Sequence, residues 1–378
     1  MPESRRQRKK VQKAKNTIAA AVTEVYQQTQ HSGDHGPAEL VFDAADPEDK
    51  LIIFSDMHRG ARNRADDFRH SEAAYNAALA YYYAMGHTLV VLGDAEELWQ
   101  EQPQAITAAY RHSLQLEAQF HLENRYIRIW GNHDDAWQHP EKVRRHLSDI
   151  FGDSLKVHEA VRIRIVNGDD FLGHLLLIHG HQGTIEGDRF GRLARFFVQT
   201  LYRPFQRLTG FSHTTPAVSW KLRAGHNRAL FEWVQQHPDL LLIAGHTHEP
   251  IFESQTHPEQ IVDEMATVHS QLEQDSGNPD LHLRLSELSA ELEWIRARQH
   301  TAGDAVATSS EAHSSPRYFN TGCCCYTDGQ ITGIELVNGA VQLIRWPDKE
   351  GNPKPEILAP KGDRRTTLLS LFGNRTSV

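Results

Sequence analysis

The segment LIIFSDMHRG, residues 51–60, joins four apolar residues directly to a serine, an aspartate and a histidine. Four consecutive apolar residues are typical of a strand that is buried on both faces of a sheet. In α/β proteins, ligand sites form beyond the carboxyl ends of such strands, where short loops bring distant residues together. The segment therefore predicts a buried strand that carries Asp56 and His58 into a functional site.

The same arrangement recurs along the chain. Mainly apolar runs at 89–92, 126–130, 175–178 and 240–244 are each followed at once by side chains that bind metals. Because the first three runs alternate with helical patterns at 65–85 and 105–124, we expect an α/β fold. The polar side chains after the five runs are, in order, Asp56 and His58; Asp94; Asn132, His133 and Asp134; His179 and His181; and His246 and His248.

Composition limits the class of protein. The chain has 378 residues with a hydrophobic content of 39%, enough for a sizeable core, and a formal net charge of -9 that disfavours general binding to nucleic acids. The three consecutive cysteines, Cys323 to Cys325, do not suit a disulfide framework, and we expect them in a buried strand rather than at a redox site. With no apolar run of 18 residues or more, the sequence predicts a soluble, cytoplasmic protein.

The chain divides into three parts. Residues 1–40 predict a basic helical arm, residues 41–347 a domain, and residues 348–378 a C-terminal tail. Two mainly helical insertions are expected in the domain, at about 184–236 and 255–316. Within the first, the segment 189–208 is rich in arginine and aromatic residues, which favours contact with a membrane surface or an amphiphilic substrate. Near the end of the domain, Asn338-Gly339 lies between two runs of alternating apolar and polar residues, which predicts a β-hairpin.

The candidate ligands offer oxygen and imidazole donors without a thiolate. Such a set suits Mn, Fe, Zn or Co and disfavours a closed structural zinc site. Seven ligands exceed the needs of one ion, and a carboxylate such as Asp94 can bridge two ions about 3.5–4 Å apart. We therefore expect two divalent ions, held by Asp56, His58, Asp94, Asn132, His179, His246 and His248.

The ordered motifs resemble the signature of the calcineurin-like metallophosphoesterases. These motifs are Asp56-x-His58, Gly93-Asp94, Gly131-Asn132-His133-Asp134, His179-Gly180 and Gly245-His246-x-His248, and 318–322 resembles the strand that follows them in that family. The resemblance implies a two-sheet β sandwich flanked by helices. It also implies that a metal-bound hydroxide hydrolyses a phosphoester.

Position by position, the resemblance assigns roles to the residues. One ion would take Asp56, His58 and His248, the other Asn132, His179 and His246, with Asp94 between them. Of the metals that suit these donors, Mn is the one expected for both ions. His133 would stabilise the transition state or protonate the leaving oxygen, with Glu97 or Asp134 orienting its imidazole.

Three further residues carry open alternatives. Arg59 would bind a substrate phosphate or lie in a solvated turn. Trp99 would form part of the site or, as we favour, pack in the core. His181 would touch metal or substrate, or lie behind the ligands.

The substrate is open between several classes. The Gly93-Asp94-x-x-Glu97-x-Trp99 pattern and the arginine- and aromatic-rich segment resemble the UDP-2,3-diacylglucosamine diphosphatases, from which the chain differs at His133 and His181. The alternatives are a general or cyclic-nucleotide phosphodiesterase, a protein serine/threonine phosphatase and a nuclease. A catalytically silent interaction scaffold is the non-enzyme alternative. Sequence predicts a small-molecule or lipid-linked phosphoester and leaves the oligomeric state open.

Overall fold

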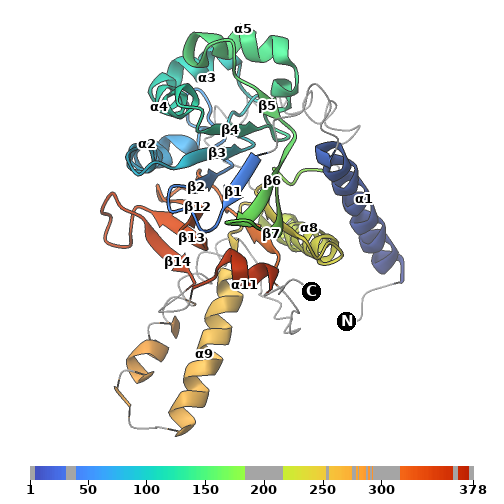
Figure 1. The fold of residues 1–378 in the computed structure, drawn as a ribbon, viewed down its shortest axis with the longest axis vertical. Helices are drawn as coiled ribbons and strands as arrows, with labels where there is room; N and C mark the ends of the chain where they lie inside the picture. The colour runs from blue at the N-terminus through green and yellow to red at the C-terminus, as the bar shows by residue number, and fades with distance from the viewer. Residues whose placement is uncertain are drawn as a thin grey trace.

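Two mixed seven-stranded sheets form the body of the protein (Figure 1). The computed structural model describes residues 5–30, 40–183, 216–252, 255–274, parts of 278–292, 316–360 and 365–373. The first sheet contains, in spatial order, β1 (Leu40–Asp43), β6 (Ala160–Asn167), β7 (Asp170–Ile178), β8 (Leu240–Ala244), β11 (Tyr318–Asn320), β9 (Ile251–Phe252) and β10 (Gln255–Thr256). The second contains β14 (Glu356–Ala359), β13 (Ala340–Trp346), β12 (Ile331–Val337), β2 (Leu51–Phe54), β3 (Thr88–Leu92), β4 (Tyr126–Ile129) and β5 (Val157–His158).

The alternation of side chains along β2 shows how the layers are built. Leu51 and Ile53 enter a core between the two sheets, whereas Ile52 and Phe54 enter a core between the second sheet and its helices. Both faces of the strand are thus buried, which is why its sequence is apolar throughout. The predicted α/β class is confirmed. The helices on this outer face are α2 (Phe68–Ala84), α3 (Pro103–Ala109), α4 (Arg111–Leu122) and α5 (Pro140–Phe151), with the short η1 (Asp135–Gln138).

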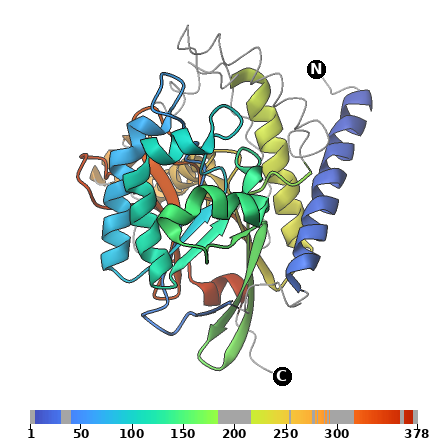
Figure 2. The ribbon, with the colours of Figure 1, turned by 90° about the horizontal axis from the view of Figure 1, so that it is seen from above.

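The outer face of the first sheet is covered by α1 (Arg5–Gln30) and α8 (Pro216–Gln235), on the opposite side from α2 and α4 (Figure 2). Val22 of α1 is fully buried in a core that includes Leu176 and Leu242 of the sheet. The Trp233 indole nitrogen donates to Thr23 Oγ1 over 2.9 Å and joins the two helices. The predicted helix is therefore present over 5–30, but its apolar face is part of a core and is not a free arm.

The C-terminal segment also differs from its prediction as a tail. β14 pairs with β13 in antiparallel fashion, and α11 (Leu368–Phe372) buries Leu368, Leu371 and Phe372 in the core between the sheets. The hairpin prediction is confirmed, because β12 and β13 pair up to Val337 and Ala340. Asn338 and Gly339 both have positive φ, as the tight turn requires.

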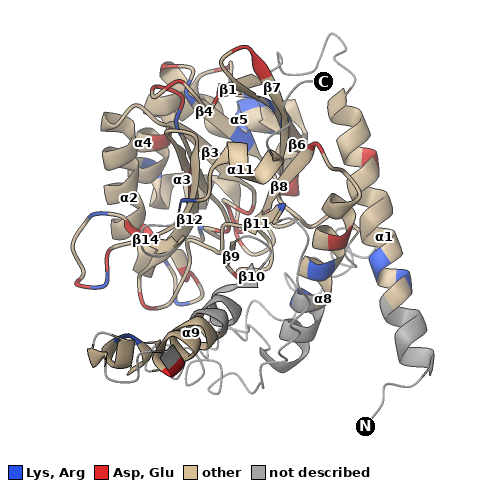
Figure 3. Ribbon diagram, turned by 60° about the horizontal axis from the view of Figure 1, so that its bottom comes forward, with Lys and Arg blue, Asp and Glu red and all other residues tan. Residues whose placement is uncertain are grey.

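The predicted insertions are described in part. The first contains α8, and its segment 189–208 lies outside the described residues. The second contains α9 (His257–Gln274), which projects from the sheets (Figure 3) and carries a small apolar cluster with Ile261 and Val268. Among the described helices, none is both long and apolar enough to cross a membrane.

Phe372 offers a test of the packing of α11. Its ring lies against Gly173 of β7, at a place where a β-carbon would clash with it. We expect Phe372→Ala to lower the free energy of unfolding by about 3–5 kcal/mol, measured by urea denaturation, because a buried ring is lost. Leu369→Ala on the exposed side of α11 is the control and should change it by about 0.5 kcal/mol or less. Equal effects of the two substitutions would contradict this packing.

Candidate metal centre

The candidate ligands gather because the strands that precede them are neighbours. β2, β3 and β4 run parallel in one sheet, and β7 and β8 run parallel in the other, so their carboxyl ends share an edge. Asp56, Asp94 and Asn132 follow strands of the second sheet, whereas His179 and His246 follow strands of the first. The site therefore lies where the carboxyl ends of both sheets meet.

The loops reach the site in an unusual backbone conformation. Asp56, His58, Asp94, His246 and His248 all have positive φ, between 49° and 69°. This conformation is uncommon for residues other than glycine, and each such residue costs about 1–3 kcal/mol unless its surroundings hold it in place. Five of the eight non-glycine residues with positive φ among the described residues are thus predicted ligands, which indicates that these loops are shaped to aim their side chains.

Asp56, His58 and His248 form the first group of candidate ligands. Asp56 Oδ1 lies 3.2 Å from His248 Nε2 and 3.8 Å from His58 Nε2, and the two imidazole nitrogens are 3.2 Å apart. The other oxygen of Asp56 accepts the amide N–H of His246 over 3.0 Å. One oxygen therefore holds a loop, while the other faces the imidazoles.

Asp94, His179 and His246 form the second group, with one atom of each within 4.8 Å of the others. Asp94 Oδ2 lies 3.1 Å from His179 Nε2 and also 3.6 Å from His58 Nε2, a member of the first group. His179 Nδ1 donates to Leu92 O over 2.9 Å, which leaves Nε2 for the site. Asp94 therefore lies within 4 Å of a member of each group, and its role as a bridging carboxylate stays a prediction.

Asn132 lies on the adjoining loop and is 4% exposed. Neither its side-chain oxygen nor its side-chain nitrogen has a hydrogen-bond partner among the described residues. A buried amide without partners is costly, and a metal ion would satisfy its oxygen. Gly131 lets this loop approach closely, since a β-carbon there would clash with Asp94 Oδ1.

The charges of the site favour a cation. Burial opposes ionisation of Asp56, but His248 and His179 bring its pKa below the ordinary value, and His179 similarly lowers the pKa of Asp94. Burial disfavours protonated imidazole, yet Asp94 and Asp56 raise the pKa of His179 to about 9, and Asp56 raises the pKa of His248 to about 9. The carboxylates thus call for positive charge, which a metal ion can supply. The buried clusters of aspartate and histidine could hold metal ions.

His133 lies beside these groups with Glu97 as its neighbour. Glu97 Oε2 is 2.8 Å from His133 Nδ1 and 3.2 Å from His58 Nδ1. Asp134, the alternative neighbour, instead accepts the amides of Ala95 and Gly131 and braces two loops. Of the two carboxylates that sequence left open, the structure places Glu97 against His133.

Trp99 is more than core packing. Its ring stacks on the imidazole of His133, with centroids 4.2 Å apart and planes inclined by 21°. Its indole nitrogen donates to Asn132 O over 2.7 Å. The favoured prediction that Trp99 only packs in the core therefore missed its contacts with His133 and Asn132. The Gly93-Asp94-x-x-Glu97-x-Trp99 pattern was the sequence signal for a role at the site.

Arg59 does not face the site, and both predictions for it are corrected. Its side chain is fully buried and pairs with Glu96 and Glu117, both of which are fully buried too. Arg128 of β4 also pairs with Glu96. Burial of the guanidinium among carboxylates leaves it no open face for a phosphate and no contact with solvent. Glu117 comes from α4, 58 residues away, so no local pattern reveals this partner.

Two further histidines lie near the ligands. His181 is buried with its ring centroid 5.5 Å from that of His179, but it belongs to none of the groups of metal-binding side chains among the described residues. His226 of α8 is buried, 5.3 Å from His246 between ring centroids. Sequence reasoning missed His226, because nothing in the helical pattern of the insertion sets it apart.

The cysteine run was only partly predicted. Cys323 and Cys324 are buried as expected, but they lie in the loop after β11 rather than in a strand. Cys325 is half-buried, and its sulfur lies 3.8 Å from His248 Nδ1. The basic neighbour that the sequence lacks is thus supplied by the fold.

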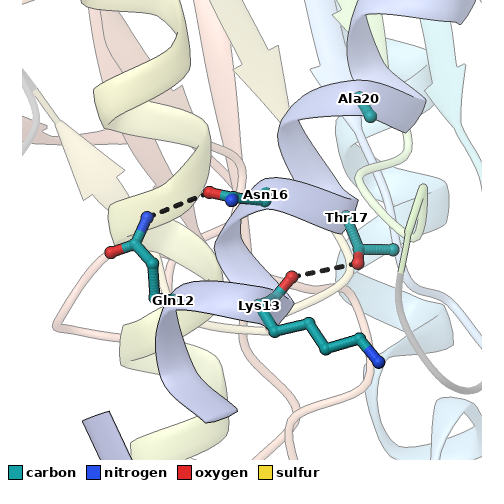
Figure 4. Close-up of a pocket in the computed structure, with 5 residues that line it drawn as sticks. All are labelled: Gln12, Lys13, Asn16, Thr17 and Ala20. Carbon is teal, nitrogen blue, oxygen red and sulfur yellow. Dashed lines mark hydrogen bonds between the residues drawn. The ribbon is translucent and has the colours of Figure 1, made fainter. Parts of the chain in front are cut away.

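A surface pocket along α1 is separate from these groups (Figure 4). It contains none of the candidate ligands and is lined by Gln12, Lys13, Asn16, Thr17 and Ala20.

In comparisons with known proteins, no family model matches the chain. A search of curated proteins found no match either.

The buried position of Arg59 predicts a stability effect. Arg59→Ala should lower the free energy of unfolding by about 3–5 kcal/mol in urea denaturation, because it leaves Glu96 and Glu117 buried without a partner. Arg62→Ala is the control, since Arg62 pairs with Glu72 at the surface and should contribute about 0–1 kcal/mol. An Arg59→Ala protein of unchanged stability would show that the ion pairs are not formed.

The position of Asp94 predicts a loss of metal. Asp94→Asn should lower the affinity for Mn²⁺ by more than the roughly 10–100-fold that is typical of an outer-shell partner, because the carboxylate near both groups is lost. Binding is measured by titration calorimetry and elemental analysis. Asp153→Asn, an exposed position with the same change of charge, should bind metal normally. Normal metal content in Asp94→Asn would rule out the bridging assignment.

Proposed function

We propose that the chain is a calcineurin-like metallophosphoesterase with the sandwich fold of that family, and that it hydrolyses a phosphoester with two divalent ions. The observation that carries the proposal is the convergence of Asp56, His58, Asp94, His179, His246 and His248 from loops of two sheets. If these residues served only as turns at the ends of their strands, they would not need to converge at one place.

The two groups of ligands suit two ions of this kind. One would be held by Asp56, His58 and His248 and the other by Asn132, His179 and His246, with Asp94 in contact with both. Mn²⁺ is favoured by the oxygen and imidazole donors, and Fe, Zn or Co also fits. When bound, the ions would activate water and neutralise charge on the phosphoryl oxygens.

His133 is the proposed acid. Burial opposes ionisation of Glu97, but His133 lowers its pKa to about 2, so that Glu97 is a carboxylate at neutral pH. This carboxylate lies 2.8 Å from His133 Nδ1, so Nδ1 faces Glu97 and Nε2 would be the nitrogen that faces a substrate oxygen. Stacking on Trp99 fixes the plane of the ring. A proton carried by Nε2 would then be donated to the leaving oxygen, and the imidazole would be left neutral.

The burial of Arg59 excludes it from the residues that would bind the substrate phosphate. Since Arg59 is engaged with Glu96 and Glu117, it contributes no charge to a substrate phosphate. Phosphate would be recognised through the ions and His133.

A substrate screen tests the proposal. The metal-free protein is assayed with an aryl phosphate, an aryl phosphodiester and a nucleotide diphosphate sugar, with and without Mn²⁺. We expect Mn²⁺-dependent hydrolysis of at least one, which Asp94→Asn abolishes. Preference for the nucleotide diphosphate sugar would favour a UDP-2,3-diacylglucosamine diphosphatase-like activity, and hydrolysis of the monoester alone would favour a phosphatase. A metal-loaded protein inactive on all three, and on a phosphopeptide and a polynucleotide, would favour the interaction scaffold.

If His133 is the acid, its loss should lower the rate of hydrolysis without lowering the amount of bound metal. His133→Ala should retain the bound metal but lower kcat about 10²–10⁴-fold, the range typical of a positioned proton donor. Metal content and kcat are measured on the same preparation. His112→Ala, which removes an exposed imidazole, is the control and should keep both. Unchanged kcat in the His133 variant would argue against the proposed acid.

A further inference from the structure

Two sulfur atoms lie near the imidazole of His248. Cys325 Sγ is 3.8 Å from His248 Nδ1. The sulfur of Cys323, the sulfur of Cys325 and a ring nitrogen of His248 all lie within 4.8 Å of one another. Meanwhile His248 Nε2 is 3.2 Å from Asp56 Oδ1. The two nitrogens of one imidazole thus face two different sets of donors.

We propose that Cys323, Cys325 and His248 form a site for one soft or borderline metal ion, such as Zn²⁺, which shares the imidazole of His248 with the proposed hydrolytic centre. Two thiol sulfurs with one imidazole are donors that zinc prefers, in contrast to the oxygen and imidazole donors of the other groups. Zinc–sulfur and zinc–nitrogen distances of about 2.3 and 2.0 Å place the two donor atoms about 3.5 Å apart in a tetrahedral site. The separation of 3.8 Å between Cys325 and His248 agrees with this geometry.

The loop that carries the sulfurs is held in place by its backbone. The amide of Cys323 donates to Thr332 Oγ1 over 3.2 Å, and the amide of Cys324 donates to Asp56 O over 3.2 Å. The carbonyl of Cys323 accepts the amide of Thr332 over 3.1 Å. Ordering of the site on binding therefore costs little conformational entropy, which favours affinity.

An ion can reach the site from solvent on the side of Cys325 and His248. The side chain of His248 is 29% exposed, and Cys325 is half-buried, whereas Cys323 is 2% exposed. The middle cysteine does not take part. Cys324 is fully buried in the core beneath the helices, with its sulfur 3.9 Å from Thr332 O. Alternate cysteines therefore point to different surroundings, and Cys324 provides a matched control.

Cadmium is a suitable probe, because it is soft and its bonds to sulfur absorb in the ultraviolet. The reduced, metal-free, full-length protein is titrated with Cd²⁺ while this charge-transfer band is recorded. We expect a band that saturates at one equivalent in the wild type and in Cys324→Ser. The double variant with Cys323→Ser and Cys325→Ser should lose the band while still binding Mn²⁺. If the double variant does not fold, as judged by circular dichroism, Cys325→Ser alone should lose it.

The test separates this site from the proposed hydrolytic centre. Asp94→Asn should keep the cadmium band while it loses Mn²⁺, because Asp94 belongs to the other donor set. The thiol site is overturned if the wild type shows no saturable band, if the band survives Cys325→Ser, or if Cys324→Ser removes it from a folded protein. None of these outcomes measures phosphoester hydrolysis, so the thiol site can fail while the proposed function stands.

Discussion

Each of two buried carboxylates ties together loops that come from different strands. Asp56, after β2, accepts the amide of His246, after β8, and so joins the two sheets. Asp94, after β3, accepts the amide of His133, after β4. Each carboxylate turns its second oxygen toward imidazoles. The residues that would hold the ions are therefore also the residues that bring the loops together, and the geometry of the site depends on both roles at once.

A second set of buried charges supports the loop that carries Glu97. Glu96 accepts the Trp137 indole N–H over 2.8 Å and pairs with Arg59 and Arg128. Removal of such groups from water is costly unless each charge has a partner, and here the pairs supply them. This arrangement links α4, β4 and the loops after β2 and β3. Glu97 follows Glu96 in the chain and faces His133. The buried ion pairs of Glu96 therefore help to fix the carboxylate that lies beside the proposed acid.

The elements that sequence predicted well are those with a local cause. The apolar runs, the polar residues at their ends and the Asn338-Gly339 turn each follow from neighbours in the chain. The residues whose surroundings were wrongly predicted have partners that are distant in sequence. Arg59 pairs with Glu117, and the cysteines lie near His248. Likewise, the apolar faces of α1 and α11 became part of cores only through contacts with other elements. The arrangement of ligands around Asp94 was expected from family resemblance, and periodicity alone gave the α/β class.

The packing of α1 has a consequence for how the chain is made. This helix buries Val22 against α8 and the strands of the first sheet, all of which are translated well after it. At roughly 5–20 residues per second, ribosomes take on the order of ten seconds or more to add the residues up to Gln235. In the first part of that interval the apolar stripe of α1 lacks β6 and β7, and until its end the stripe lacks α8. The apolar face of α1 is thus expected to become covered in steps, first by β6 and β7 and last by α8 and β8.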